Sequence, residues 1–160
     1  MSNVDKNKAT LNFIATYPGI ATSPIFVNFI NAKNDDIQFI TDANDVYLNS
    51  RFVDGSVLKR YTFSIVITKS ITDLAIAKDV MLNENIDDIA DIQAFMDWIN
   101  EQGENDIFPD FGEKCVIEEM HTLAENPSLD GIDDEVTPAL ALYSIDIRID
   151  YIDYSKTVWS

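Results

Sequence analysis

The feature that most restricts the possible fold is a strict alternation of side chains in residues 143–151. Every second position there is large and apolar: Tyr143, Ile145, Ile147, Ile149 and Tyr151. The positions between them are polar: Ser144, Asp146, Arg148 and Asp150. Because successive side chains of a strand point to opposite faces, this period of two predicts a strand with one core face and one polar face. Such a strand is typical of an antiparallel sheet that is covered on one side.

Three further segments have strand character, and two of them flank an Asp-Gly pair. Residues 47–53 and 57–68 are predicted to be strands joined across Asp54-Gly55, and residues 37–41 (IQFIT) are predicted to be another strand. In 57–68 the apolar face consists of Tyr61, Phe63, Ile65 and Ile67. A tight type I′ turn needs positive φ at both central residues, which Asp-Gly tolerates. The sequence therefore predicts a hairpin with a two-residue turn.

A helical period appears in two places. The longer stripe consists of Ile86, Ile89, Ile92, Phe95, Met96 and Ile99. Asn85 is expected to cap this helix and Gly103 to end it. A shorter helix is predicted over residues 8–17, ended by Pro18-Gly19.

The other segments are less specific. Residues 24–30 and 115–123 fit either a strand or a helix, and residues 71–84 fit a loop with a helical turn. The acidic stretch that begins at Glu125 is expected to be a loop.

Together these patterns predict an α+β fold in a single domain over residues 1–160. We expect a mostly antiparallel sheet of four to five strands, with one main amphipathic helix and a smaller helix packed on one face. A chain of 160 residues, 46% of them hydrophobic, can form a substantial core. The ends, about 1–8 and 153–160, are expected to be flexible.

The charge of the chain narrows the possible partners. Eleven basic residues against 28 acidic ones give a net charge of −17, which disfavours binding to nucleic-acid phosphates. Solubility is the commonest reason for such acidity. A DNA mimic and a conduit through which DNA slides are the sharper alternatives. The first residues lack the apolar run of a signal peptide, and no later run reaches the length of a membrane span, so a soluble cytosolic protein is expected.

Residues for catalysis or metal binding are sparse. His121 is the single histidine, and Cys115 lies six residues before it without a supporting motif, so a structural or surface role is favoured for His121. Asp42 and Asn44 begin like a calcium loop, but Val46 occupies a position that needs an oxygen ligand. We therefore expect no enzymatic activity, no cofactor and no metal, and a protein that acts by contact.

The order of these features resembles that of tail-completion proteins of long-tailed bacteriophages and phage-tail-like particles. These proteins are also called tail terminators or minor capsid proteins. The resemblance extends roughly from Leu11 to Ile152. The segments that carry it are the hairpin 52–67, the helix 87–104, the proline turn 107–111, the segment 115–129 and the closing strand 140–152.

The resemblance implies a structural protein of a virion or tail-like particle, assembled in the bacterial cytoplasm. It would cap the finished tail tube as a ring, typically a hexamer, stop tube polymerisation and form the head–tail joining surface. The implied partners are other copies of the chain, the tail-tube protein and head–tail connector proteins. DNA would pass through the ring without specific binding, and no membrane is involved. The alternatives are another connector or tube component of the same particle, or an acidic DNA-mimic inhibitor.

For such a ring, the hairpin is the candidate contact with a neighbouring subunit or the tube. The candidate contact residues are Arg51, Asp54, Gly55, Ser56, Lys59, Arg60 and Trp159. The basic residues of the hairpin would pair with acidic patches of a partner, or alternatively keep a sheet edge soluble. Trp159 fits either a partner contact or packing on its own sheet. A second candidate is the acidic loop that contains Asp130, Asp133, Asp134 and Glu135.

Overall fold

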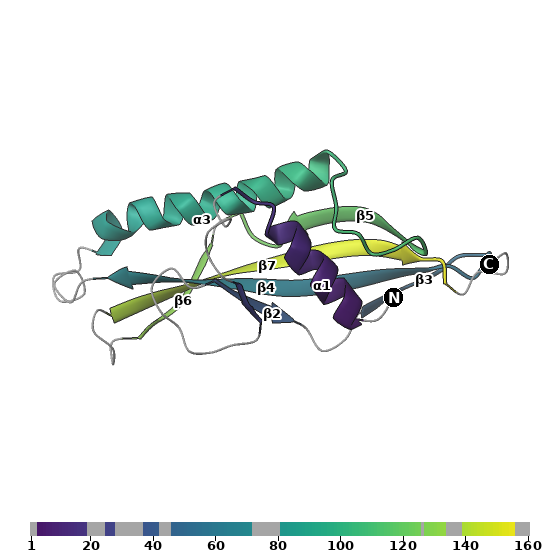
Figure 1. Ribbon diagram of the computed structural model, residues 1–160, viewed down its shortest axis with the longest axis horizontal. Coiled ribbons are helices and arrows are strands. Elements are labelled where there is room, and N and C mark those ends of the chain that lie inside the picture. Colours follow the sequence, from purple (N-terminus) through teal and green to yellow (C-terminus); the bar gives the residue numbers. More distant parts are fainter. Residues whose placement is uncertain are drawn as a thin grey trace.

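The computed structural model describes residues 3–18, 25–27, 37–41, 46–71, 81–125, 127–133 and 139–155. In these residues the chain forms two helices, α1 (Asn3–Ile14) and α3 (Met81–Glu104), on one side of a sheet (Figure 1). The strands of the sheet are β1 (Ile25–Val27), β2 (Ile37–Thr41), β3 (Val46–Arg51), β4 (Val57–Ile71), β5 (Cys115–Thr122), β6 (Ser128–Asp133) and β7 (Ala139–Asp153).

The sheet is built around β4 and β7, which are 15 residues long each. They pair antiparallel along their full length, from Val57 opposite Asp153 to Ile71 opposite Ala139. Strands β3 and β2 follow one another along the second edge of β4, and β5 and β6 do the same along β7. Strand β1 adds to β2 in parallel. The predicted α+β class with a mostly antiparallel sheet is confirmed. The sheet follows the path β1-β2-β4-β7-β5, and β3 and β6 pair with β4 and β7 beside this path.

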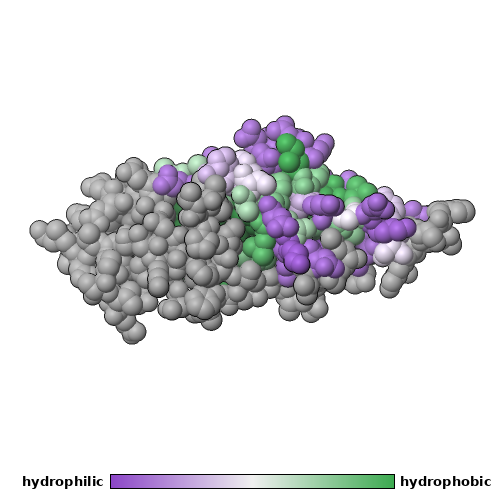
Figure 2. All heavy atoms as spheres, in the orientation of Figure 1, coloured by the Kyte–Doolittle hydropathy of each residue, from purple (hydrophilic) through white to green (hydrophobic). Residues whose placement is uncertain are grey.

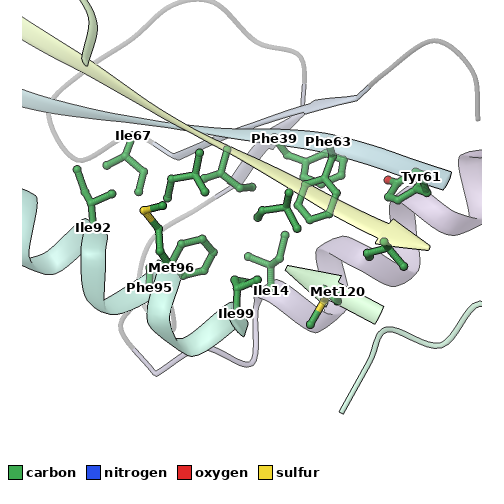
Figure 3. Close-up of a cluster of buried hydrophobic side chains, with 14 of the residues drawn as sticks. Ile14, Phe39, Tyr61, Phe63, Ile67, Ile92, Phe95, Met96, Ile99 and Met120 are labelled. Carbon is green, nitrogen blue, oxygen red and sulfur yellow. The ribbon is translucent and has the colours of Figure 1, made fainter. Parts of the chain in front are cut away.

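The core lies between the sheet and the helices, where the predicted alternation places it. Every residue of the two predicted apolar faces is buried: Tyr61, Phe63, Ile65 and Ile67 on β4, and Tyr143, Ile145, Ile147, Ile149 and Tyr151 on β7. Figure 3 shows side chains of α3, among them Ile92, Phe95 and Ile99, pointing toward those of β4. Burial of this apolar surface is the main stabilising term of the fold.

Helix α3 begins at Met81, so the predicted cap at Asn85 is wrong. The predicted stop at Gly103 is also wrong, because the helix continues to Glu104. A Cβ at Gly103 would overlap the backbone carbonyl oxygen of Met120 on β5. Glycine is therefore needed here for the close approach of helix and strand, and a stop signal was the wrong interpretation of it.

A side-chain amide fixes the same end of α3 to β5. Asn100 accepts a hydrogen bond from the backbone N–H of Thr122 (3.0 Å) and donates through Nδ2 to the Thr122 hydroxyl (3.0 Å). The Thr122 hydroxyl in turn donates to the carbonyl of Ala124 (2.9 Å). Since Thr122 is buried and water cannot reach it, these bonds supply hydrogen-bond partners to polar groups that would otherwise have none.

Helix α1 starts earlier than predicted, and residues 3–8, expected to belong to a flexible end, form its first turns. Lys6 is 4% exposed; its Nζ donates to the hydroxyl of Tyr151 (2.7 Å) and lies 4.8 Å from the centre of that ring. The Tyr61 hydroxyl donates to Oδ1 of Asn7 on the next position of the helix. These contacts tie the start of α1 to the two central strands.

Aromatic stacking holds the other end of α1 against α3. The rings of Phe13 and Trp98 are stacked with their centroids 5.3 Å apart. The ring centroid of Tyr17, just beyond the helix, lies 5.1 Å from that of Phe95 and 5.2 Å from that of Trp98. Figure 2 shows this side of the molecule, where hydrophilic residues lie over α1 and the C-terminal end of α3, with apolar residues between them.

Three segments that the sequence left open or placed in a loop contain strands. Part of 24–30 forms β1, and 115–123 contains β5. Part of the expected acidic loop is a strand, β6, because it pairs with residues 140–144 of β7. Register shifts in β5 and β6 break the period of two, which explains why neither strand shows a clear alternation in the sequence. Most of 71–84 lies outside the described residues before α3 begins.

Candidate interaction surface

The hairpin between β3 and β4 has a longer turn than predicted. The backbone N–H of Gly55 donates to the carbonyl of Phe52 (3.0 Å), and the N–H of Phe52 donates to the carbonyl of Ser56 (2.9 Å). Gly55 has a φ of 91°, whereas Asp54 does not have positive φ. The type I′ turn is therefore wrong. The loop has three residues, 53–55, with glycine at the position that needs positive φ.

Asp54 and Ser56 stabilise this turn. One carboxylate oxygen of Asp54 accepts hydrogen bonds from the Ser56 N–H (2.9 Å) and the Ser56 hydroxyl (2.6 Å). Both hydrogen bonds lower the pKa of Asp54. An aspartate that bonds the backbone two residues later is a common turn former. The role of Asp54 and Ser56 within the chain is thus to shape the hairpin.

The tip of the hairpin is apolar and exposed. Val53 is fully exposed and Phe52 is 45% exposed. In Figure 1 the hairpin projects past the ends of both helices, so neither helix covers these side chains. Large apolar residues at a projecting tip are suited to contact with another protein.

Two basic residues of the hairpin, Lys59 and Arg60, are paired within the chain. Lys59 Nζ lies 2.9 Å from Oδ2 of Asp153, and both side chains are less than one-fifth exposed. Burial raises the pKa of Asp153, but hydrogen bonds from Ser155 and Lys59 outweigh it and lower that pKa to about 2. Arg60 forms a two-pronged contact with Asp150: Nε to Oδ1 at 2.9 Å and an Nη nitrogen to Oδ2 at 3.3 Å.

Asp150 is the centre of a larger network on the sheet face away from the helices, called the outer face below. Arg148 approaches Asp150 (3.8 Å) and donates to Glu119 on β5 (3.3 Å). Asp150 is only 6% exposed, and burial alone would raise its pKa. Hydrogen bonds with Arg60 and then Glu119, together with the charges of Arg60 and Arg148, overcome this, so the pKa of Asp150 lies below its ordinary value. The network therefore contains two cations and two anions that balance one another.

The register arranges the outer face in rows across neighbouring strands. The row nearest the hairpin is apolar and consists of Leu58, Ile152 and Val116. The next row is charged and consists of Arg60, Asp150 and Glu119. A third row contains Thr62, Arg148 and His121. Farther along, the Ser64 hydroxyl donates to Asp146 (2.5 Å), beside a shallow hollow that is also lined by Leu123.

The structure brings only some of the predicted contact residues together. Asp54, Gly55, Ser56, Lys59 and Arg60 lie in or next to the hairpin turn, and Arg51 ends β3 with its backbone opposite Val57. The acidic residues Asp130 and Asp133 lie in β6, on the part of β7 farthest from the hairpin. Trp159, Asp134 and Glu135 lie outside the described residues.

His121 and Cys115 do not form a pair, because they lie on opposite faces of β5. His121 lies opposite Arg148 on the outer face, and Cys115 lies opposite Asp153 at the start of β5. Burial, and then the nearby charge of Asp153, raise the pKa of the Cys115 thiol, which lowers its reactivity.

Sequence reasoning proposed the hairpin as a contact but did not find the apolar row or the apolar side chains at the hairpin tip. Phe52 and Val53 read as the end of a strand, and Val116 sits just before the register shift of β5, where the alternation is lost. The sequence did contain evidence for part of the apolar row, because Leu58 and Ile152 are apolar residues on strand faces that are mostly polar. Only the register shows that they lie side by side.

No model of a known protein family matches the chain, and no curated protein matches it. Within the part of the chain that the structure describes, no group of three or more His, Cys, Asp or Glu side chains is placed to hold a metal ion. No helix among the same residues is both long and apolar enough to cross a membrane.

Proposed function

We propose that the protein is a structural component of a phage tail or tail-like particle that caps the finished tail tube as an oligomeric ring. It would stop tube polymerisation and offer the surface to which head–tail connector proteins attach. The resemblance in the order of sequence features supports this class of protein, and the α+β fold is compatible with it.

The observation that carries the proposal is the contrast between charged and apolar side chains at the hairpin. Lys59 and Arg60 are paired with aspartates of the chain and Asp54 is hydrogen-bonded by Ser56, whereas Phe52 and Val53 are exposed at a projecting tip. Protein interfaces are apolar and poor in unpaired charges at their centre. The hairpin end thus has the character of a protein contact.

This contrast changes how the hairpin would make contact. From the sequence, Arg51, Lys59 and Arg60 could either pair with acidic groups of a neighbour or keep a sheet edge soluble. In the structure, Lys59 and Arg60 already bind aspartates of their own chain. We therefore assign contact to the apolar tip and give the two basic residues the task of holding the hairpin in place.

The net charge fits a ring through which DNA passes. A charge of −17 repels phosphate, so DNA would move through the opening without being held.

A tube-growth assay tests the proposal. Tail-tube protein of the same particle is allowed to polymerise, and elongation is followed by light scattering before and after the purified chain is added. We expect growth to stop once enough chain is present to form one ring at each growing tube end. Unchanged elongation in excess chain would refute the capping role.

A further inference from the structure

An apolar surface forms where the outer face meets the hairpin. It consists of the apolar row and the hairpin tip: Phe52, Val53, Leu58, Val116 and Ile152. We call this surface the apolar end. Three of its members, Phe52, Val53 and Val116, are exposed, and the other two are half-buried.

The charged groups beside the apolar end are balanced. The adjoining row and its neighbour contain Arg60 and Arg148 against Asp150 and Glu119, all joined by ion pairs. The whole chain, in contrast, carries −17. The apolar end therefore adjoins a locally neutral part of a strongly anionic molecule.

This balance indicates the kind of partner. A basic partner would be drawn to unpaired carboxylates, and an acidic one would be repelled by most of the surface. Two copies of the same anionic chain repel one another except where their surfaces are neutral and apolar. The apolar row meets this condition, because the two charged rows beside it contain as many basic as acidic side chains.

We infer that the apolar end is the surface through which one copy of the chain binds a second copy. This inference rests on the proposed function, because it identifies the surface through which neighbouring copies in the proposed ring bind one another. Among the described residues, the hairpin tip supplies the most exposed large apolar side chain, Val53. The row of Leu58, Ile152 and Val116 supplies apolar side chains from three paired strands. The neighbouring ion pairs form the polar rim that such a contact needs.

Charge insertion at the apolar end tests this inference. Val53→Lys places a charge at a fully exposed tip, and Val116→Lys places one in the apolar row. Leu129→Lys is the matched control, because Leu129 is also 47% exposed on an edge strand but lies on β6, away from the hairpin. Circular dichroism with thermal unfolding checks that each variant keeps its fold.

Sedimentation velocity over micromolar to millimolar concentrations gives the readout. We expect the unaltered chain to self-associate, and each apolar-end variant to raise the dissociation constant at least about tenfold. The Leu129→Lys control should associate like the unaltered chain. Equal association of all four proteins, or a monomeric unaltered chain at every concentration, would overturn the inference. Either result leaves the capping role to the tube-growth assay, so the two failures are distinguishable.

Discussion

At the scale of single residues, the chain uses its few basic side chains to hold its two central strands. Lys59 and Arg60 of β4 each bind an aspartate of β7, and Lys6 of α1 binds Tyr151 of the same strand. In a chain with 28 acidic residues, the Lys59–Asp153 and Arg60–Asp150 pairs neutralise carboxylates that the sheet buries or half-buries. The local excess of basic residues seen in the sequence therefore has a structural cause.

The pair of Lys59 and Asp153 makes stability depend on pH in a predictable direction. The folded state lowers the pKa of Asp153 to about 2, below its ordinary value, so its contribution is present above about pH 4 and is lost as pH falls toward 2. Asp153→Asn should lower the free energy of unfolding near neutral pH by ~1 kcal/mol, a figure reduced for solvent screening. The deficit should shrink toward zero near pH 2.

Urea denaturation at several pH values measures this difference. Glu104→Gln, which alters an exposed carboxylate at the end of α3, serves as the control and should follow the unaltered chain throughout. A deficit of Asp153→Asn that stays constant from neutral pH to about pH 2 would contradict the assigned ion pair.

At the scale of elements, the sequence predicted best what depends on regular periods. The alternation in β7 and β4 identified both strands and their buried faces, because apolar residues recur at every second position over 143–151 of β7 and 61–67 of β4. It failed where the register shifts, in β5 and β6, since a single extra residue exchanges the faces. The hairpin was predicted but not its turn, because Asp-Gly also fits a loop in which only glycine needs positive φ.

The candidate surface was less predictable than the fold for a related reason. Sequence reasoning found the hairpin and its charges, but the partners of those charges lie about 90 residues away on β7. Whether a lysine is paired or available depends on pairing between distant strands. The apolar row has the same origin, since Leu58, Ile152 and Val116 become neighbours only through the sheet register.

The packing of α3 on β5 gives a prediction at this scale. Gly103→Ala would force its Cβ into the Met120 carbonyl, and a backbone atom cannot move aside without shifting the strand. We expect a loss of about 1–3 kcal/mol in the free energy of unfolding, even though alanine favours helices. Chemical denaturation followed by circular dichroism measures it.

Gly112→Ala is the contrasting variant. Gly112 has a φ of 92° but has no atom within 4 Å of the position of a Cβ, so only backbone strain would arise. Its cost should be about 1 kcal/mol. If Gly103→Ala were as stable as the unaltered chain, the close contact between α3 and β5 would be incorrect.

At the scale of the whole molecule, the two sides of the sheet have different tasks. One side carries both helices (Figure 1) and the core. The other carries a balanced charge network that ends in apolar residues at the hairpin. The capping role and the self-contact at the apolar end are the proposals that make use of this second side.

Electron microscopy of tail tubes mixed with the purified chain tests the capping role most directly. We expect one additional ring of density at one end of each tube, made of several 18.0 kDa chains, and no such density along the tube wall. Val53→Lys should reduce the number of capped ends, and Leu129→Lys should leave it unchanged. Bare tube ends in the presence of excess chain, or chain bound along the tube wall, would contradict the capping role.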